Sequence, residues 1–195
     1  FFIKSDGSLW ATGYNGYGAL GDGSTANRST PAQVATGVAG VAMSLEHTVF
    51  LKSDGSLWGM GDNSSGELGD GTTTNRSTPV AIATGVRTAA VNHGNTFFVK
   101  SDGGLWTSGA LTGAANGYRP VQAGSGVSHI SAGIFSTSYL KSDGTLWGFG
   151  TVSDGLQGAP SIGSTYPTTV QYATGVAALA VADASTVFLK TDGTI

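Results

Sequence analysis

Short apolar runs alternate with segments rich in glycine, serine and threonine along the chain. One group consists of Val38–Ala42, Thr48–Leu51, Leu57–Trp58 and Val80–Ala83, separated by polar loops. Runs this short, bounded by turn-forming residues, predict β-strands. The second run is apolar at consecutive positions, which is typical of a strand buried on both faces. We therefore predict units of four antiparallel strands.

One heptapeptide, Lys-Ser-Asp-Gly-Ser-Leu-Trp, marks these units. It begins at residues 4 and 52, close copies begin at 100 and 141, and a shortened copy begins at 190, so the spacings are 48, 48, 41 and 49 residues. Self-similarity at such a period is a feature of solenoids and propellers. Each propeller blade lies between two neighbours, which accounts for strands buried on both faces. The sequence predicts an all-β propeller of four-stranded antiparallel blades.

The expected repeat units are approximately 4–51, 52–99, 100–140 and 141–189, with a partial unit at 190–195, in one domain over 1–195. Residues 1–4 and 186–190 both read as second strands, so the two ends carry the same element. Proteins normally cover an unpaired apolar strand. We expect a domain that is incomplete at both ends, forms part of a larger propeller, and is completed by further repeats or by neighbouring copies.

The heptapeptide has the chemistry of a turn rather than of a reactive site. An Asp side chain bonds the backbone that follows it, and Gly adopts positive φ without a steric penalty. Trp is the largest apolar residue at constant phase, so we expect the tryptophans to occupy equivalent buried positions. The residues to which we assign a structural role in the repeat are Asp6, Gly7, Trp10, Asp54, Gly55, Trp58, Asp102, Gly103, Trp106, Asp143, Gly144, Trp147, Asp192 and Gly193.

Composition excludes several classes of partner. The net charge is −3 and the chain has no run of Lys or Arg, which argues against a nucleic-acid partner. No apolar stretch approaches the roughly 18 residues that span a bilayer, so we expect no membrane insertion. The chain lacks cysteine, which excludes disulfides and thiolate metal ligands.

Three further patterns do not support cofactor, metal or catalytic chemistry. Residues 16–21 spell GxGxxG, but the following Asp-Gly-Ser-Thr does not begin the helix that a dinucleotide site needs. Residues 62–67 resemble half of a calcium loop and lack its distant glutamate. The three histidines stand at different phases, and no nucleophile elbow is present. We therefore expect no catalytic residue, cofactor or metal ligand, and a protein that is not an enzyme.

The segments 63–71, His47-Thr48 and Lys-Ser-Asp-Gly-Ser-Leu-Trp-Gly resemble the repeat of the regulator of chromosome condensation, and most of all its bacterial secreted relatives. The resemblance covers nearly the whole chain, although the Leu-Gly-Asp-Gly element at 20–23 and 68–71 is absent after Trp106 and altered after Trp147. It implies a propeller of the seven-bladed type. Members of this family include an exchange factor for a small GTPase and a secreted β-lactamase inhibitor, which act by protein–protein contact.

Strand parity divides the loops between two faces. In an antiparallel unit, the loops joining strands one and two leave from the same edge as those joining strands three and four. These loops vary between repeats, whereas the Ser-Asp-Gly turns on the opposite edge do not. Variable loops on a rigid scaffold are common binding sites. Our candidate partner-binding residues are Tyr14, Tyr17, Glu46, His47, His93, Tyr118, Arg119, Phe135 and Tyr166.

Two hypotheses of function follow. The first is a non-catalytic propeller scaffold of an exported bacterial protein that binds another protein or a surface glycan through the variable loops. The second is a purely structural repeat in a cell-surface or extracellular assembly. An exchange-factor or enzyme-inhibitor propeller is a further alternative. The low charge and the absence of cysteine favour an extracellular or cell-surface location.

Overall fold

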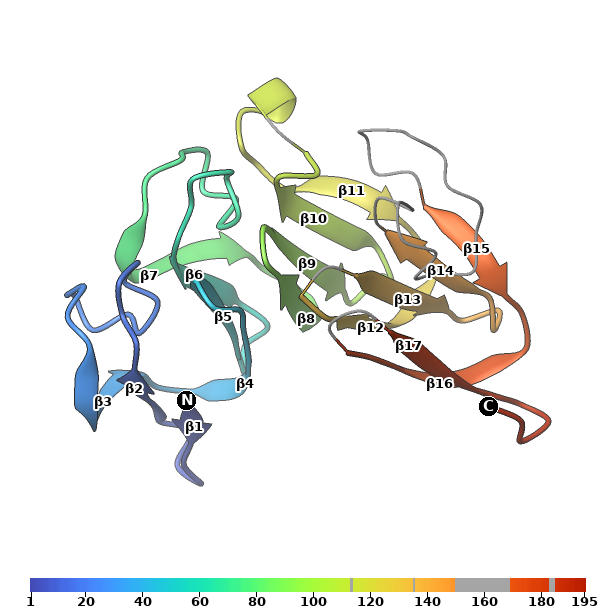
Figure 1. Ribbon diagram of the computed structural model, residues 1–195, viewed down its shortest axis with the longest axis horizontal. Helices are drawn as coiled ribbons and strands as arrows, with labels where there is room; N and C mark the ends of the chain where they lie inside the picture. The colour runs from blue at the N-terminus through green and yellow to red at the C-terminus, as the bar shows by residue number, and fades with distance from the viewer. Residues whose placement is uncertain (113, 135, 150–168, 183–184) are drawn as a thin grey trace.

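The computed structural model describes all residues except 113, 135, 150–168 and 183–184. The described residues form seventeen strands in five antiparallel sheets, together with a 3-10 helix at Ala114–Asn116. The sheets follow one another in chain order from the N-terminus to the C-terminus (Figure 1). This arrangement confirms the all-β prediction.

Each sheet contains strands that are consecutive in the chain. The first holds β1 (Phe2–Ile3), β2 (Leu9–Gly13) and β3 (Arg28–Ala35). The second holds β4 (Val38–Met43), β5 (His47–Lys52), β6 (Leu57–Gly61) and β7 (Arg76–Ala83). The third holds β8 (Val86–Asn92), β9 (Asn95–Lys100), β10 (Leu105–Gly109) and β11 (Val121–Gly124). The fourth holds β12 (Val127–Ala132), β13 (Thr137–Lys141), β14 (Leu146–Phe149) and β15 (Val170–Ala173), and the fifth holds β16 (Val176–Val181) and β17 (Thr186–Lys190).

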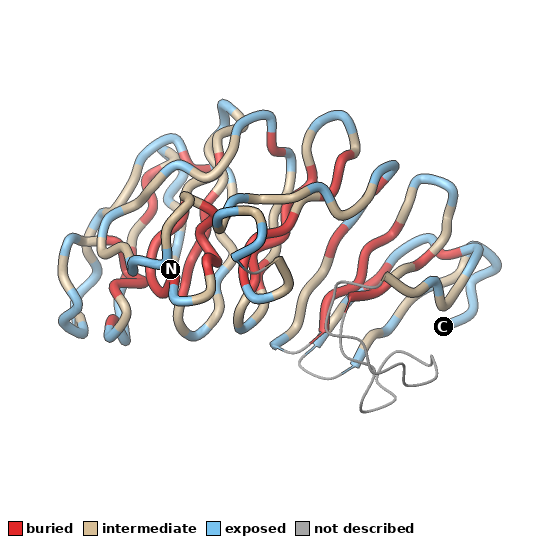
Figure 2. Tube along the Cα trace, turned by 90° about the horizontal axis from the view of Figure 1, so that it is seen from above, coloured by how far each residue is buried: buried red, intermediate tan, exposed pale blue. Residues whose placement is uncertain are grey.

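The hydrophobic core lies between the sheets. Val49 on β5 packs with Phe98 of the third sheet, whereas its neighbour Phe50 packs with Leu9 of the first. Successive side chains of a strand point to opposite faces, so β5 buries one face against each neighbouring blade. Buried segments accordingly run through the strands, and exposed residues gather at the loops (Figure 2). The apolar run that predicted a strand covered on both faces thus forms two interfaces.

The heptapeptide forms a hairpin turn whose side chains bond one another. The Oδ1 of Asp54 accepts hydrogen bonds from the backbone N–H and the hydroxyl of Ser56, at 2.8 and 2.6 Å. Gly55 has a φ of 80°, in the left-handed region that favours glycine. The ammonium of Lys52 lies 4.9 Å from the centroid of the Trp58 ring. Five of the seven residues of the heptapeptide therefore have a local structural partner or conformation.

The four tryptophans occupy equivalent positions, but the prediction that they are buried is wrong in degree. Each is half-buried, pairs across the hairpin with residue 2, 50, 98 or 139, and has the ammonium of the preceding lysine over its ring. The fully buried position belongs to the leucine that precedes each one, such as Leu57. The indole is amphipathic. It packs on the hairpin and leaves one ring face available to a cation.

Candidate functional site

Loops that are distant in sequence meet at one end of the sheets. The Asp62 N–H donates to the Glu46 carbonyl, which ties a loop between third and fourth strands to one between first and second strands. The next blade repeats this bond between Ala110 and Gly94, both at 2.9 Å. We call this end the variable face. It comprises the short loops 44–46, 93–94 and 133–134 and the long loops 14–27, 62–75 and 110–120, of which residue 113 lies outside the described residues.

The opposite end joins the hairpin turns to the connectors between blades. The Val38 N–H donates to the Gly7 carbonyl, and the Ser53 N–H donates to the Gly37 carbonyl, both at 2.9 Å. The same pair of bonds recurs between later blades. We call this end the constant face. The separation into two faces is the one that strand parity predicts.

The second long loop is held rigid by a buried amide. Asn63 is fully buried, and its Nδ2 donates to the Asp70 carboxylate and to the carbonyls of Thr72 and Thr74. Its Oδ1 accepts from the Leu68 N–H at 2.9 Å. Asn15 makes the corresponding bonds in the first long loop. A fully bonded amide at the centre fixes the loop conformation, so these loops can present side chains in a defined geometry.

The first and second long loops also lie over the next blade. The Gly23 N–H donates to the Ser77 carbonyl at 2.8 Å, and a Cβ added to Gly18 would lie 2.7 Å from the Ser77 Cα. One blade later, a Cβ on Gly66 would lie 2.7 Å from the Tyr118 ring. The glycines of this element permit the close approach of successive loops. The GxGxxG segment at 16–21 is therefore a packing element, and it leads to strand β3 rather than to a helix.

Four of the predicted residues come together on the variable face. Tyr14 and Tyr17 meet edge to face at 6.4 Å between ring centroids, and the Glu46 carboxylate lies close enough to act on the Tyr17 phenol. Oε2 of Glu46 lies 3.8 Å from Nδ1 of His93. The nearby Glu46 charge raises the pKa of Tyr17 because it opposes formation of a phenolate. Three blades thus contribute to one cluster, which we call the Tyr–Glu cluster.

His47 is buried, so its assignment as a direct partner contact is wrong. It is fully enclosed, with Nδ1 3.0 Å from the Ser44 hydroxyl and Nε2 3.2 Å from the Thr96 hydroxyl of the next blade. Burial lowers the pKa of His47 from 6.5 to about 4, so the ring is neutral near pH 7. His47 instead positions the loop 44–46 and links two blades.

An apolar hollow next to the cluster was missed by the sequence reasoning. It has a volume of about 240 Å³ and lies among the short loops of the second, third and fourth sheets. Met43, Leu45 and Ile134 line it and are between 44% and 73% exposed. The Ile134 carbonyl accepts from the His93 N–H at 3.1 Å, which joins two of the contributing loops. The signal for it is an apolar residue inside a polar loop, as in Ser44-Leu45-Glu46.

The remaining predicted residues stand apart or lie outside the described residues. Tyr118 is half-buried over Gly66, with a φ of 56°, and the exposed Arg119 has its guanidinium over Gly71. Both lie on the variable face, in the third long loop. Phe135 and Tyr166 lie outside the described residues.

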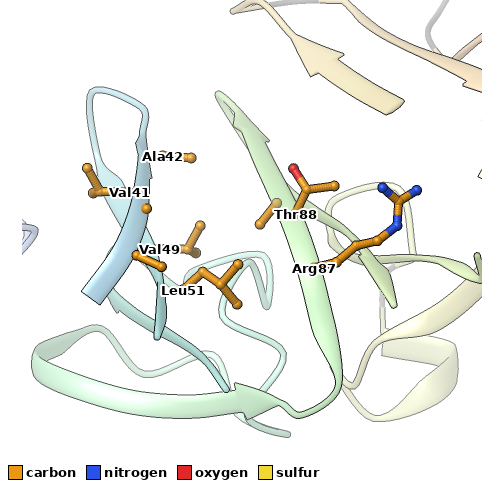
Figure 3. A pocket seen from close by; sticks show the side chains of 9 residues that line it. Val41, Ala42, Val49, Leu51, Arg87 and Thr88 are labelled. Atoms are coloured by element: carbon orange, nitrogen blue, oxygen red, sulfur yellow. The ribbon is translucent and has the colours of Figure 1, made fainter. Parts of the chain in front are cut away.

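A second hollow of about 360 Å³ opens between β4 and β8. Its side chains are small or aliphatic, and Val49 and Leu51 point across it toward β8 (Figure 3). Arg87 lies at its edge with the side chain directed away, and its Nη2 donates to the carbonyls of Val127 and Ser128 at 2.6 and 2.8 Å. The hollow therefore offers no free charged side chain for chemistry.

Two ion pairs hold charged side chains of the long loops on the variable face. Asp22 and Asp70 are paired with Arg28 and Arg76, at 2.9 and 2.6 Å. Among the described residues, no group of three or more His, Cys, Asp or Glu could hold a metal ion. In the same part of the chain, no helix has the length and apolarity needed to cross a bilayer. The variable face is therefore a partly apolar surface with an acidic and aromatic rim.

Comparisons with known proteins match the first two repeats to a family. The model of the Regulator of chromosome condensation (RCC1) repeat matches residues 6–51 and 54–99, and a second model of the same description matches residues 38–67. A search of curated proteins found no match.

Several solved propellers are similar in structure. Human WBSCR16 is 20% identical, with a TM-score of 0.79 over 97% of this chain and 55% of that one. Prp20p from Saccharomyces cerevisiae, described with its binding to Gsp1p and histones, is 16% identical, with a TM-score of 0.82 over 98% of this chain and 53% of that one. A structure of Kap60 bound to yeast RCC1 (Prp20) gives 15% identity and a TM-score of 0.79, over 98% of this chain and 52% of that one. The chain spans about half the length of these proteins, and at these identities the likeness shows the fold alone.

Proposed function

This chain carries repeats of the regulator of chromosome condensation (RCC1) family, and from that premise we propose that it is a non-catalytic propeller scaffold that binds another protein through its variable face. The observation that carries the proposal is the apolar hollow beside the Tyr–Glu cluster. Exposed apolar patches rimmed by polar groups mark interaction sites on soluble proteins. Fully bonded loop centres reduce the entropy lost when such a surface binds.

The yeast Prp20p is described with protein partners, and the proposal extends that mode of action to this chain without extending the partners. Exchange on a GTPase and inhibition of an enzyme are both forms of such contact. An exported bacterial setting is part of the proposal. It is supported by the loops rich in Ser, Thr and Gly and by a charged fraction of 11%.

The test is selection of binders from a displayed library of protein fragments from the source genome. The immobilised baits are the unaltered protein, a Leu45→Glu/Ile134→Glu variant of the hollow, and a Ser5→Glu/Ser53→Glu variant of the constant face. Both variants add two negative charges at exposed or partly exposed positions. Fragments retained by the unaltered protein and the constant-face variant, but lost by the hollow variant, are the expected result.

Recovery of no fragment, or loss of binding only with the constant-face variant, would contradict the proposal. A glycan array, screened in parallel, distinguishes a carbohydrate ligand from a protein ligand. Glycan binding through the same face, without any protein fragment, would replace a protein partner by a carbohydrate.

A further inference from the structure

Charge is distributed unequally between the two faces. All five lysines occur in the heptapeptide copies at residues 4, 52, 100, 141 and 190, so they belong to the constant face. On the variable face, Arg28 and Arg76 are held in ion pairs, and the exposed Arg119 lies over Gly71 on another loop. Glu46 is not paired with a lysine or arginine in the ion pairs of the described residues; its Oε2 lies 3.8 Å from the imidazole of His93, and its side chain keeps 20% of its surface exposed. The rim of the hollow is therefore acidic and lacks a lysine.

The aromatic rings beside this carboxylate complete a surface that suits a cation. Tyr14 is 55% exposed, and its ring lies across Gly16, where an added Cβ would approach the Tyr14 hydroxyl within 2.2 Å. Tyr17 meets Tyr14 edge to face, and the charge of Glu46 acts on its phenol, so both rings lie beside the carboxylate. An ammonium or guanidinium over an aromatic face is attracted by the ring quadrupole, and a carboxylate adds a charge-assisted hydrogen bond.

The apolar hollow determines which type of partner side chain can bind next to the cation. Leu45, which lines the hollow, is adjacent in sequence to Glu46. The volume of about 240 Å³ is below the roughly 300–1,000 Å³ of a typical small-molecule pocket, and it suits a side chain of a protein segment. The binding surface is thus acidic and aromatic on one side and aliphatic on the other.

We propose that the variable face recognises a segment of its protein partner in which a lysine or arginine stands next to an aliphatic residue. The cationic side chain lies against Tyr14, Tyr17 and Glu46, and the aliphatic side chain enters the hollow between Leu45 and Ile134. This inference rests on the proposed protein-binding function and adds the chemistry of the partner to it.

Four blocked hexapeptides test the inference in low salt: Gly-Ser-Lys-Leu-Gly-Ser and versions with Glu for Lys, Gln for Lys, or Gly for Leu. Affinity is measured from amide chemical shifts of the isotope-labelled protein. We expect the Lys-Leu peptide to bind on the order of tenfold more tightly than the Glu-Leu peptide. The shifts should centre on residues 44–46, 93 and 134. Equal affinities, or shifts confined to the constant face, would overturn the inference.

Two variants test which residues cause the preference for the Lys peptide over the Glu peptide. Glu46→Gln should remove most of the discrimination between the Lys and Glu peptides, and Tyr14→Leu should reduce it while retaining apolar bulk. Asp54→Asn on the constant face removes the same charge as Glu46→Gln and keeps an oxygen for the Ser56 bonds, so it should leave the discrimination unchanged. An equal loss in Glu46→Gln and Asp54→Asn would show general charge attraction and would also overturn the inference.

The fragment selection separates this inference from the function on which it rests. Fragments that bind the variable face but lack a basic–aliphatic pair, and that tolerate Glu46→Gln, would refute the inference alone. Failure to recover any fragment would refute the proposed function.

Discussion

The indole Nε1 of Trp58 donates a hydrogen bond of 2.9 Å to the hydroxyl of Ser56, two residues earlier in the same turn. Because Ser56 also donates to Asp54, the three side chains form a continuous chain of hydrogen bonds. Ser8 and Thr145 occupy the same position in two other blades and make the same bond to tryptophan.

The third blade lacks this bond, which leads to a stability prediction. Gly104 stands in place of the serine, and a Cβ there would lie 3.0 Å from the Asp102 carboxylate and 3.2 Å from Nε1 of Trp106. Gly104→Ser should stabilise the protein by about 1 kcal/mol, through the added bond and a less flexible unfolded chain. Urea denaturation measures the change, with Ser56→Gly as the reverse control. A destabilised Gly104→Ser variant would show that the turns are not equivalent.

Asn63 should determine the order of the second long loop. Replacing it with alanine removes the bonds that its amide donates to Asp70, Thr72 and Thr74 and leaves the buried Leu68 N–H without its acceptor. We expect a loss of about 2–4 kcal/mol in stability. Faster hydrogen exchange should be confined to residues 64–75, where Ser64→Ala provides a control. An Asn63→Ala variant with unchanged exchange in this loop would refute its role.

Alanine substitutions at two glycines distinguish the effect of a steric contact on stability from the effect of backbone conformation. A Cβ on Gly61 would lie 2.4 Å from the Glu46 carbonyl, whereas one on Gly13, at the same position of the first blade, would have no atom within 4 Å. Both have positive φ, so each alanine variant should lose about 1–2 kcal/mol from strain. Gly61→Ala should lose more and should shift the amide signals of residues 44–46. Equal destabilisation of the two variants would contradict the close contact.

The repeat predicted the sheets because turn chemistry and strand burial are local. Asp-Gly turns and consecutive apolar residues such as Val49 and Phe50 specify a strand between two layers without knowledge of the partner. The site was less accessible to sequence reasoning. The contact between Glu46 and His93 depends on how two blades pack, and His47 is buried although it follows Glu46 directly. Leu45 resembles a core residue in the sequence, yet the loop directs it outward.

His47 should make stability depend on pH. Its pKa is about 4 in the folded protein against 6.5 when unperturbed, so the unfolded chain binds the extra proton first on acidification. Stability is therefore retained above pH 6.5 and falls toward pH 4, by at most about 3 kcal/mol. Asp62 and His93 also act on this ring, the first raising and the second lowering its pKa.

Urea denaturation between pH 7 and pH 4 measures this dependence. His47→Gln should flatten the decline, whereas His129→Gln, at an exposed position, should not. An equal decline in the unaltered protein and in His47→Gln would assign the pH dependence to other groups.

We expect partner proteins to bind the variable face. Site-specific photo-crosslinking in the source cells measures which face they contact. A photoreactive amino acid replaces Leu45 on the variable face or Ser53 on the constant face, both of them exposed. The account predicts a discrete protein adduct from position 45 and none from position 53. Adducts from position 53 alone, or from neither position, would contradict it.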